Sequence, residues 1–206
     1  MCIRDRCLYS LFAHVPGLRV VVPSTPYDAK GLLIRAIRSD DPVLFLEHKL
    51  LYNVPFLPFG VSGAVPEQEY EIPFGRAIRR RQGKDITIVA VALMIHKALA
   101  AADRLAKEGI DVEVLDLRTI VPFDRNTIVE SVAKTGRLLV VDEDYLSFGL
   151  SGEIVAVICE SLQGKLKRGP MRLAVPDVPI PASHPMEQYV IPSEEKICNS
   201  ARALMQ

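Results

Sequence analysis

The sequence predicts an α/β fold built from open sheets that are covered by helices. Short β-rich apolar segments alternate along the chain with longer segments whose apolar residues recur at helical spacing. Of the 206 residues, 49% are hydrophobic and 24% are charged, which is the composition of a globular protein with a sizeable core. A stretch rich in proline and glycine separates two such alternating regions, so two units are expected.

The first region predicts a helix near the N-terminus and then a strand–helix–strand unit. Residues 18–22 and 43–47 are the two apolar strand segments. Between them, Thr25 is placed to cap a helix that begins at Pro26, with Asp28 reaching back in a capping box. This spacing predicts a parallel strand pair with both faces of the sheet covered. The apolar face of the helix is expected at Leu32, Leu33, Ala36 and Ile37.

The second region predicts an open sheet flanked by helices. It follows residues 53–75, which lack sustained periodicity and are expected to form a linker or a long ordered connection. Asp124 is expected as an N-cap, Gly136 as a C-terminal glycine, and Ser193 as the cap of a last helix. The predicted strands are 86–91, 112–117, 138–142 and 172–175. The predicted helices are 95–108, 125–135, 151–162 and a last one that runs to about Met205.

The N-terminal residues Met1–Arg6 are too short and too charged for a signal peptide. The helical segment that follows them begins without a capping residue, although it carries an apolar stripe. We therefore expect the chain to be truncated at its N-terminus, and Met1–Arg6 not to be native sequence.

Composition argues against several classes of partner. The 25 Lys and Arg residues balance 25 Asp and Glu residues without a long basic run, which argues against nucleic acid. The locally basic stretch Arg76–Arg81 is expected to be a solvated helix end. No apolar run approaches the roughly 18 to 20 residues of a membrane span. The four cysteines have neither disulfide-framework nor zinc spacing, so a cytoplasmic protein is expected.

Two segments at strand ends invite comparison with catalytic motifs. Gly149–Glu153 resembles a nucleophile elbow, but Glu153 stands where that motif needs glycine, so a helix N-cap is expected at Ser151. Asp142–Asp144 lie at a strand end, where α/β sheets bind ligands, although three adjacent acids more often form a solvated loop. No glycine-rich phosphate-binding loop is present.

Histidine supplies the best candidate for proton transfer. None of the four histidines has metal-ligand spacing. His96 lies in a predicted helix and His48 at the end of a predicted strand, and a structural role is expected for both. His14 stands just before Pro16 and Gly17, on a rigid turn. An imidazole held on such a turn can donate or accept a proton near neutral pH, so His14 is a candidate acid–base residue.

Ten ordered motifs identify a family. They are Phe12–Leu18, Val22–Leu33, Ala36–Arg38, Pro42–Val43, Glu47–His48, Leu51–Tyr52, Ile72–Gly75, Glu113–Thr119, Lys134–Arg137 and Pro176–Pro181. With these motifs the chain resembles the β subunit of thiamine diphosphate-dependent 2-oxoacid dehydrogenases, which covers the pyruvate, branched-chain 2-oxoacid and acetoin dehydrogenase complexes. The resemblance extends from about Leu8 to the end of the chain.

The resemblance implies a domain assignment and a shared cofactor site. Residues 1–52 would be the C-terminal end of a pyrimidine-binding domain, 53–75 a linker, and 76–206 a transketolase C-terminal-like open-sheet domain. The family forms an α2β2 heterotetramer with thiamine diphosphate at the α/β interface. The α subunit holds the diphosphate and Mg²⁺. The β-subunit glutamate that activates the cofactor would precede the residues present here, so this chain alone is expected to be inactive.

The resemblance also implies site residues. His14 matches a family histidine implicated in passing the acyl group to the lipoyl arm, where a departing thiolate needs a proton. A family loop that holds a structural K⁺ ion, mainly through backbone oxygens, matches the segment of Ala36, Ile37, Ser39 and Asp41. Ser39 and Asp41 depart from the Asp and Asn of some relatives.

The residues and the resemblance leave three hypotheses for the function. The leading one is a β-subunit component that decarboxylates a 2-oxoacid, or cleaves acetoin, on thiamine diphosphate and acylates a lipoyl domain. Its C-terminal domain is expected to pack against a second β subunit and to dock the subunit-binding domain of the acyltransferase. The second is a non-catalytic module for dimerisation and assembly on the acyltransferase core. The third, a small hydrolase, rests on Ser151 alone.

Overall fold

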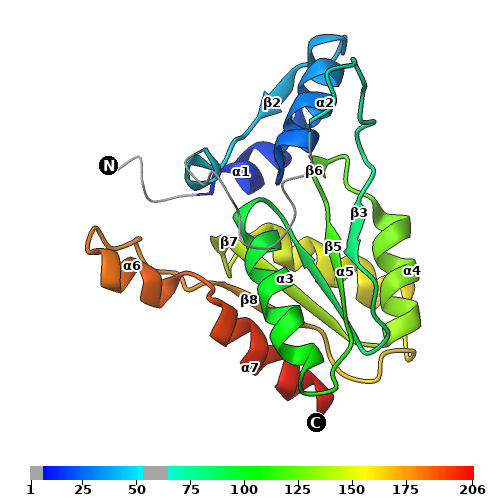
Figure 1. The fold of residues 1–206 in the computed structure, drawn as a ribbon, viewed down its shortest axis with the longest axis vertical. Coiled ribbons are helices and arrows are strands. Elements are labelled where there is room, and N and C mark those ends of the chain that lie inside the picture. The colour runs from blue at the N-terminus through cyan, green and yellow to red at the C-terminus, as the bar shows by residue number, and fades with distance from the viewer. Residues whose placement is uncertain (1–6, 53–64) are drawn as a thin grey trace.

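The computed structural model describes residues 7–52 and 65–206, so the expectations for Met1–Arg6 and for residues 53–64 lie outside the described residues (Figure 1). The strands are β1 (Arg19–Val21), β2 (Val43–Phe45), β3 (Ile78–Arg81), β4 (Ile86–Ala90), β5 (Val112–Asp116), β6 (Thr119–Val121), β7 (Leu138–Tyr145) and β8 (Met171–Val175). The helices are α1 (Tyr9–Ala13), α2 (Pro26–Ile37), the short 3-10 helix η2 (Lys49–Leu51), α3 (Leu93–Ala106), α4 (Arg125–Thr135), α5 (Leu150–Ser161), α6 (His184–Val190) and α7 (Glu194–Met205). Within these ranges no helix is long and apolar enough to span a membrane.

The first sheet has the strand order β2-β1-β6. β1 and β2 pair in parallel, as predicted, but β6 pairs antiparallel with β1 and comes from the second half of the chain. Val20 and Val21 of β1 are fully buried, whereas all three residues of β2 are only half-buried. Full coverage of both sheet faces is therefore a wrong prediction for β2.

Helix α2 begins at the predicted residue, but the side chains on its exposed side differ from the predicted ones. The Thr25 hydroxyl accepts the backbone N–H of Asp28 at 3.1 Å, which confirms the N-cap. The Asp28 carboxylate accepts from the Thr25 hydroxyl and from two arginines, which replaces the expected capping box. Leu32 is buried, but Leu33 and Ile37 are 45% and 76% exposed. The predicted apolar face is therefore wrong at these two positions, because the sheet lies under the other side of α2.

Residues 65–74, which we call the α2 strap, form the ordered connection that the sequence allowed. The Lys30 ammonium donates to the carbonyls of residues 66–68, and the Tyr70 ring stacks on Tyr27 with centroids 4.5 Å apart. Ile72 is buried against α2. The strap thus runs alongside α2 before the chain enters β3 (Figure 1).

The second sheet has the order β3-β5-β4-β7-β8 and separates two apolar layers. α3 and α7 pack on one face, and α4 and α5 on the other. The three predicted helix ends are confirmed: Asp124 accepts from the Thr127 N–H, Gly136 is left-handed at φ 74°, and Ser193 accepts from the Lys196 N–H. The parallel strands β4, β5, β7 and β8 follow the predicted open-sheet fold.

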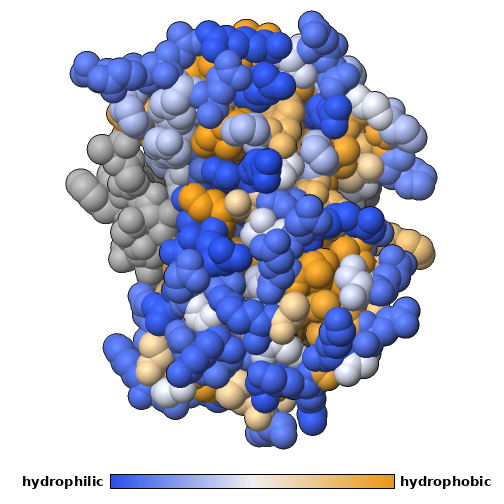
Figure 2. All heavy atoms as spheres, turned by 90° about the vertical axis from the view of Figure 1, so that its right-hand side faces the viewer, coloured by the Kyte–Doolittle hydropathy of each residue, from blue (hydrophilic) through white to orange (hydrophobic). Residues whose placement is uncertain are grey.

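Two local predictions in this half of the chain are wrong. The basic stretch is not a helix end, because residues 78–81 form β3, antiparallel to β5, and their arginines pair with carboxylates. The three adjacent acids are not a solvated loop, because β7 continues through all of them and buries Asp142 and Asp144. Figure 2 shows the face over α4, where hydrophilic side chains predominate but hydrophobic areas emerge between them.

Candidate functional site

His14 lies exposed on a compact turn between α1 and β1. It is the C-cap of α1, and the turn is closed by hydrogen bonds from Val15 N to Phe12 O (3.1 Å) and from Leu18 N to Val15 O (3.3 Å). Gly17 takes φ 85°, a conformation that costs glycine little. The imidazole is therefore accessible to a partner, on a backbone whose shape is fixed locally.

Helix α1 is seated on the C-terminal sheet. The buried Tyr9 hydroxyl donates to the Asp142 carboxylate. Phe12 and Ala13 pack against the apolar layer that contains residues of β6 and α5. Burial raises the pKa of Asp142 to about 7, so its carboxyl group takes up a proton at neutral pH more readily than an exposed one. Sequence reasoning named Asp142 only as part of an acidic run; its contact with α1 depends on folding.

The structure joins His48 to Glu143, a pair that sequence reasoning did not predict. His48 Nδ1 accepts the Leu50 N–H at 3.3 Å, so Nε2 carries the proton and donates to Glu143 Oε2 at 2.8 Å. Both side chains are mostly buried, 19% and 11% exposed. Each residue directly follows a strand segment predicted from the sequence, 43–47 for His48 and 138–142 for Glu143, which was the available signal. The pair links the segment after β2 to β7, and a structural role for His48 stays a prediction.

A buried ionic cluster ties α2 to the second sheet. Arg80 donates to the carboxylates of Asp28 and Asp116, and the Arg118 guanidinium reaches Asp28 at 3.3 Å. Ser24 also donates to Asp116 at 3.0 Å, while burial raises the pKa of Asp116 to about 6. Removing one member would leave a buried charge unpaired, so the cluster locks the relative placement of the two sheets.

His96 and Ser151 have structural positions. His96 is 1% exposed, donates from Nε2 to the Ser24 carbonyl at 2.7 Å, and has its pKa lowered by burial. Ser151 is fully buried inside the first turn of α5, whose N-cap is Gly149. The expected N-cap at Ser151 is therefore wrong. A nucleophile elbow needs an exposed hydroxyl, so the hydrolase interpretation loses its only support.

The four residues predicted for K⁺ lie at the end of α2 and in the loop after it. The Ala36 carbonyl accepts the Ser39 N–H at 3.2 Å, and the Ser39 hydroxyl accepts the Asp41 N–H at 3.2 Å. The Asp41 carboxylate is paired with Arg19 at 2.7 Å. Ile37 is the last residue of α2. The loop is thus ordered by its own hydrogen bonds, and K⁺ binding there stays a prediction.

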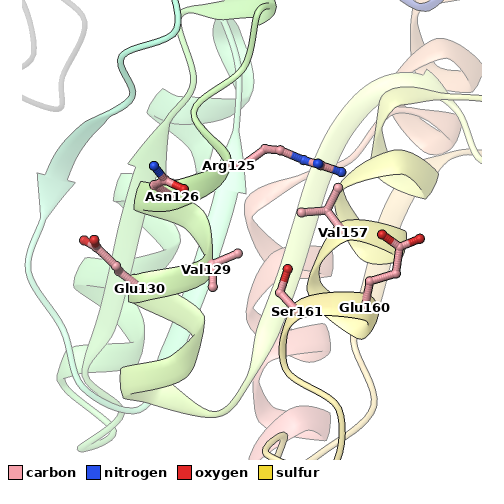
Figure 3. A pocket seen from close by; sticks show the side chains of 7 residues that line it. All are labelled: Arg125, Asn126, Val129, Glu130, Val157, Glu160 and Ser161. Carbon is pink, nitrogen blue, oxygen red and sulfur yellow. The ribbon is translucent and has the colours of Figure 1, made fainter.

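An open groove of about 310 Å³ lies between α4 and α5, far along the chain from His14 (Figure 3). Its floor is formed by Val129 and Val157, while Arg125, Glu130 and Glu160 stand at its rim. None of the predicted site residues lies in it. In the described part of the chain, no group of three or more His, Cys, Asp or Glu side chains is arranged to hold a metal ion.

Comparison with known proteins assigns the family. Residues 75–197 match the model for the transketolase C-terminal domain, and residues 7–55 match the transketolase pyrimidine binding domain. The chain belongs to the transketolase C-terminal domain family. A solved structure titled split gene transketolase, inactive beta4 tetramer, has the same fold, with a TM-score of 0.72 and 25% identity over 95% of this chain and 60% of its own.

Curated relatives confirm the resemblance to β subunits. The chain is 50% identical over 201 residues to the acetoin:2,6-dichlorophenolindophenol oxidoreductase subunit beta of Cupriavidus necator, covering 98% of this chain and 57% of the relative. It is 43% identical to the 2-oxoisovalerate dehydrogenase subunit beta of Bacillus subtilis (95% and 58% covered). It is 44% identical to the pyruvate dehydrogenase E1 component subunit beta of the same organism (97% and 59%). The chain thus spans less than three fifths of the length of these relatives.

Proposed function

We propose that the chain is part of the β subunit of a thiamine diphosphate-dependent 2-oxoacid or acetoin dehydrogenase. The observation that carries this proposal is the similarity to three differently named dehydrogenase and oxidoreductase β subunits along at least 95% of the chain. Its proposed partners are an α subunit in an α2β2 heterotetramer, a second β subunit, and the lipoyl and subunit-binding domains of an acyltransferase. The prediction of a cytoplasmic enzyme belongs to this proposal.

The described residues can supply part of such a site. His14 offers an exposed imidazole on a fixed turn, and strands β1 and β2 of the first sheet lie in the part of the chain that matches a pyrimidine binding domain. In the proposal, the α subunit supplies the groups that hold the diphosphate and Mg²⁺. Thiamine diphosphate, when bound, stabilises the negative charge formed as the substrate loses carbon dioxide or is cleaved.

His14 carries the proton step in this proposal. When a lipoyl dithiolane is reductively acylated, the electron pair left on the substrate carbon after decarboxylation or cleavage attacks one sulfur and breaks the S–S bond. The carbon is oxidised to the acyl level on that sulfur, and the other sulfur leaves as a thiolate. An imidazolium at the position of His14 can protonate that thiolate from Nδ1 or Nε2, because imidazole is the side chain that most readily transfers a proton near neutral pH. Exposure of His14 fits this role, since the lipoyl arm must arrive from solvent on another protein.

The loop after α2 is the proposed K⁺ site. The Asp41 carboxylate is held by Arg19, so backbone oxygens near Ala36, Ile37 and Ser39 would supply the ligands. A carbonyl that accepts one N–H keeps a second lone pair for a cation. This site would stabilise the end of α2 without taking part in the chemistry.

Reconstitution tests the proposed function. The full gene product that contains these residues is combined with its α partner, thiamine diphosphate and Mg²⁺, and acylation of a lipoyl domain is measured with pyruvate, branched-chain 2-oxoacids and acetoin in turn. The proposal expects turnover with at least one substrate and none when α is omitted. A stable complex with the acyltransferase core but no turnover would favour the assembly module, which the inactive beta4 tetramer of the solved relative makes a specific alternative.

A further inference from the structure

Strand β6 is an unexpected part of the first sheet, whose strand β1 follows the turn with His14. It has three residues, belongs to the half of the chain matched as the transketolase C-terminal domain, and pairs with β1. Val20 faces Val121 and Val21 faces Thr119, so the register shifts between the two pairs. So short a ladder holds few hydrogen bonds, and other contacts must keep β6 in place.

Arg118, which directly precedes β6 in the chain, makes several such contacts with the elements around it. It occupies the turn from β5 to β6 with φ 61°, and its side chain is only 9% exposed. The guanidinium donates twice to the Arg76 carbonyl, at 3.0 and 2.7 Å, and reaches Asp28 at the start of α2. Its backbone N–H donates to Asp116, and its carbonyl accepts the Val22 N–H at 2.8 Å. One residue therefore connects β5, α2, the segment just before β3 and the residue that follows β1.

The turn with His14 follows any movement of β1. Four residues separate His14 from Arg19, and the hydrogen bonds that close the turn leave it little freedom of its own. Phe12 and Ala13 also pack in the apolar layer that contains Ile120 of β6. A displaced β6 would thus shift both ends of the segment that presents the imidazole.

We propose that Arg118 is a positioning residue for His14. By holding β6 against β1, it fixes the place from which His14 protonates the lipoyl thiolate; this inference rests on the proposed function. The C-terminal domain would therefore contribute to acyl transfer through geometry, although it brings no catalytic group. Because misplacement by about 1 Å can cost a hundredfold in rate, a small loosening of β6 is enough to be measured.

The test compares Arg118→Lys with a matched arginine. Lysine keeps the positive charge but loses the planar fork that bonds the Arg76 carbonyl twice. Arg79→Lys is the control, because Arg79 also pairs with a buried carboxylate, Glu113, on the neighbouring strand, without touching β6. In the reconstituted α2β2 enzyme, decarboxylation is followed with 2,6-dichlorophenolindophenol and acylation with a lipoyl domain. Amide hydrogen exchange of residues 19–22 is measured on the same proteins.

The expected result is specific to Arg118. Arg118→Lys should slow lipoyl acylation about tenfold or more, leave decarboxylation within about twofold, and speed hydrogen exchange in β1, whereas Arg79→Lys should do none of these. Equal losses in both reactions, or unchanged acylation beside a His14→Ala variant that is impaired, would overturn the positioning role alone. If His14→Ala itself acylates normally, the role of His14 in the proposed function fails, and the inference fails with it.

Discussion

At the scale of single residues, the sequence predicted where helices begin and end, but it did not predict which carboxyl groups are buried. Thr25, Asp124, Gly136 and Ser193 act within three or four residues of themselves, so local patterns suffice to predict them. Burial of Asp142 instead depends on α1, which lies more than a hundred residues earlier in the chain. A run of acidic residues in the sequence does not indicate that a distant helix will bury one of them.

The titration of Asp142 gives a prediction for stability. Its folded pKa of about 7 exceeds the value of about 4 for an unfolded chain, so the folded protein binds the extra proton between these pH values. Stability should therefore fall as pH rises through that window. Asp142→Asn cannot titrate, so relative to the original protein its stability should rise by about 1 to 3 kcal/mol from pH 5 to pH 8.

Urea unfolding at the two pH values measures this effect. Asp40→Asn, at an exposed position, is the control and should leave the pH dependence unchanged. If Asp142→Asn shows the same dependence on pH as the original protein, burial of this carboxyl group does not control its titration.

At the scale of elements, periodicity located the long helices and the strands of the second sheet. It missed β6 and α6, because three residues cannot show a period and α6 buries none of its residues. It assigned β3 to a helix end because arginines suggest solvent. In the fold these arginines extend along the sheet edge to carboxylates of α2, β5 and α3. The ion-pair partners of these arginines, rather than their residue type, explain why this segment is a strand.

Packing of the strap on α2 predicts opposite effects for two glycines. A Cβ at Gly31 would lie 2.7 Å from side-chain atoms of both Ile72 and Tyr70, whereas at Gly152 in α5 the first neighbour is Arg172 at 3.6 Å. Alanine favours a helix over glycine by about 1 kcal/mol. Gly152→Ala should therefore stabilise the protein by up to that amount, while Gly31→Ala should destabilise it by about 1 kcal/mol as overpacking prevails.

Denaturant midpoints of the two variants distinguish these outcomes. Parallel gains in stability would show that the strap yields easily and does not hold α2. The expected contrast would show that residues 65–74 form a close-packed part of the fold.

At the scale of the whole molecule, the candidate site depends on contacts between segments that lie far apart in the sequence, which no short sequence pattern can predict. Residue type and turn chemistry made His14 one candidate among four histidines, and its role came from the family resemblance. The way that Arg118 and β6 support it became visible only in the folded chain. The chain also spans under three fifths of its relatives' length, so a cofactor site shared between subunits stays a proposal.

The central claim is that His14 serves acyl transfer rather than substrate decarboxylation. Its most direct test is His14→Ala in the reconstituted α2β2 enzyme, with lipoyl-domain acylation and dye-coupled decarboxylation measured side by side. General acid catalysis contributes about a hundredfold or more, so acylation should fall by at least that factor while decarboxylation changes only severalfold. Unimpaired acylation, or an equal loss in both reactions, would contradict the claim.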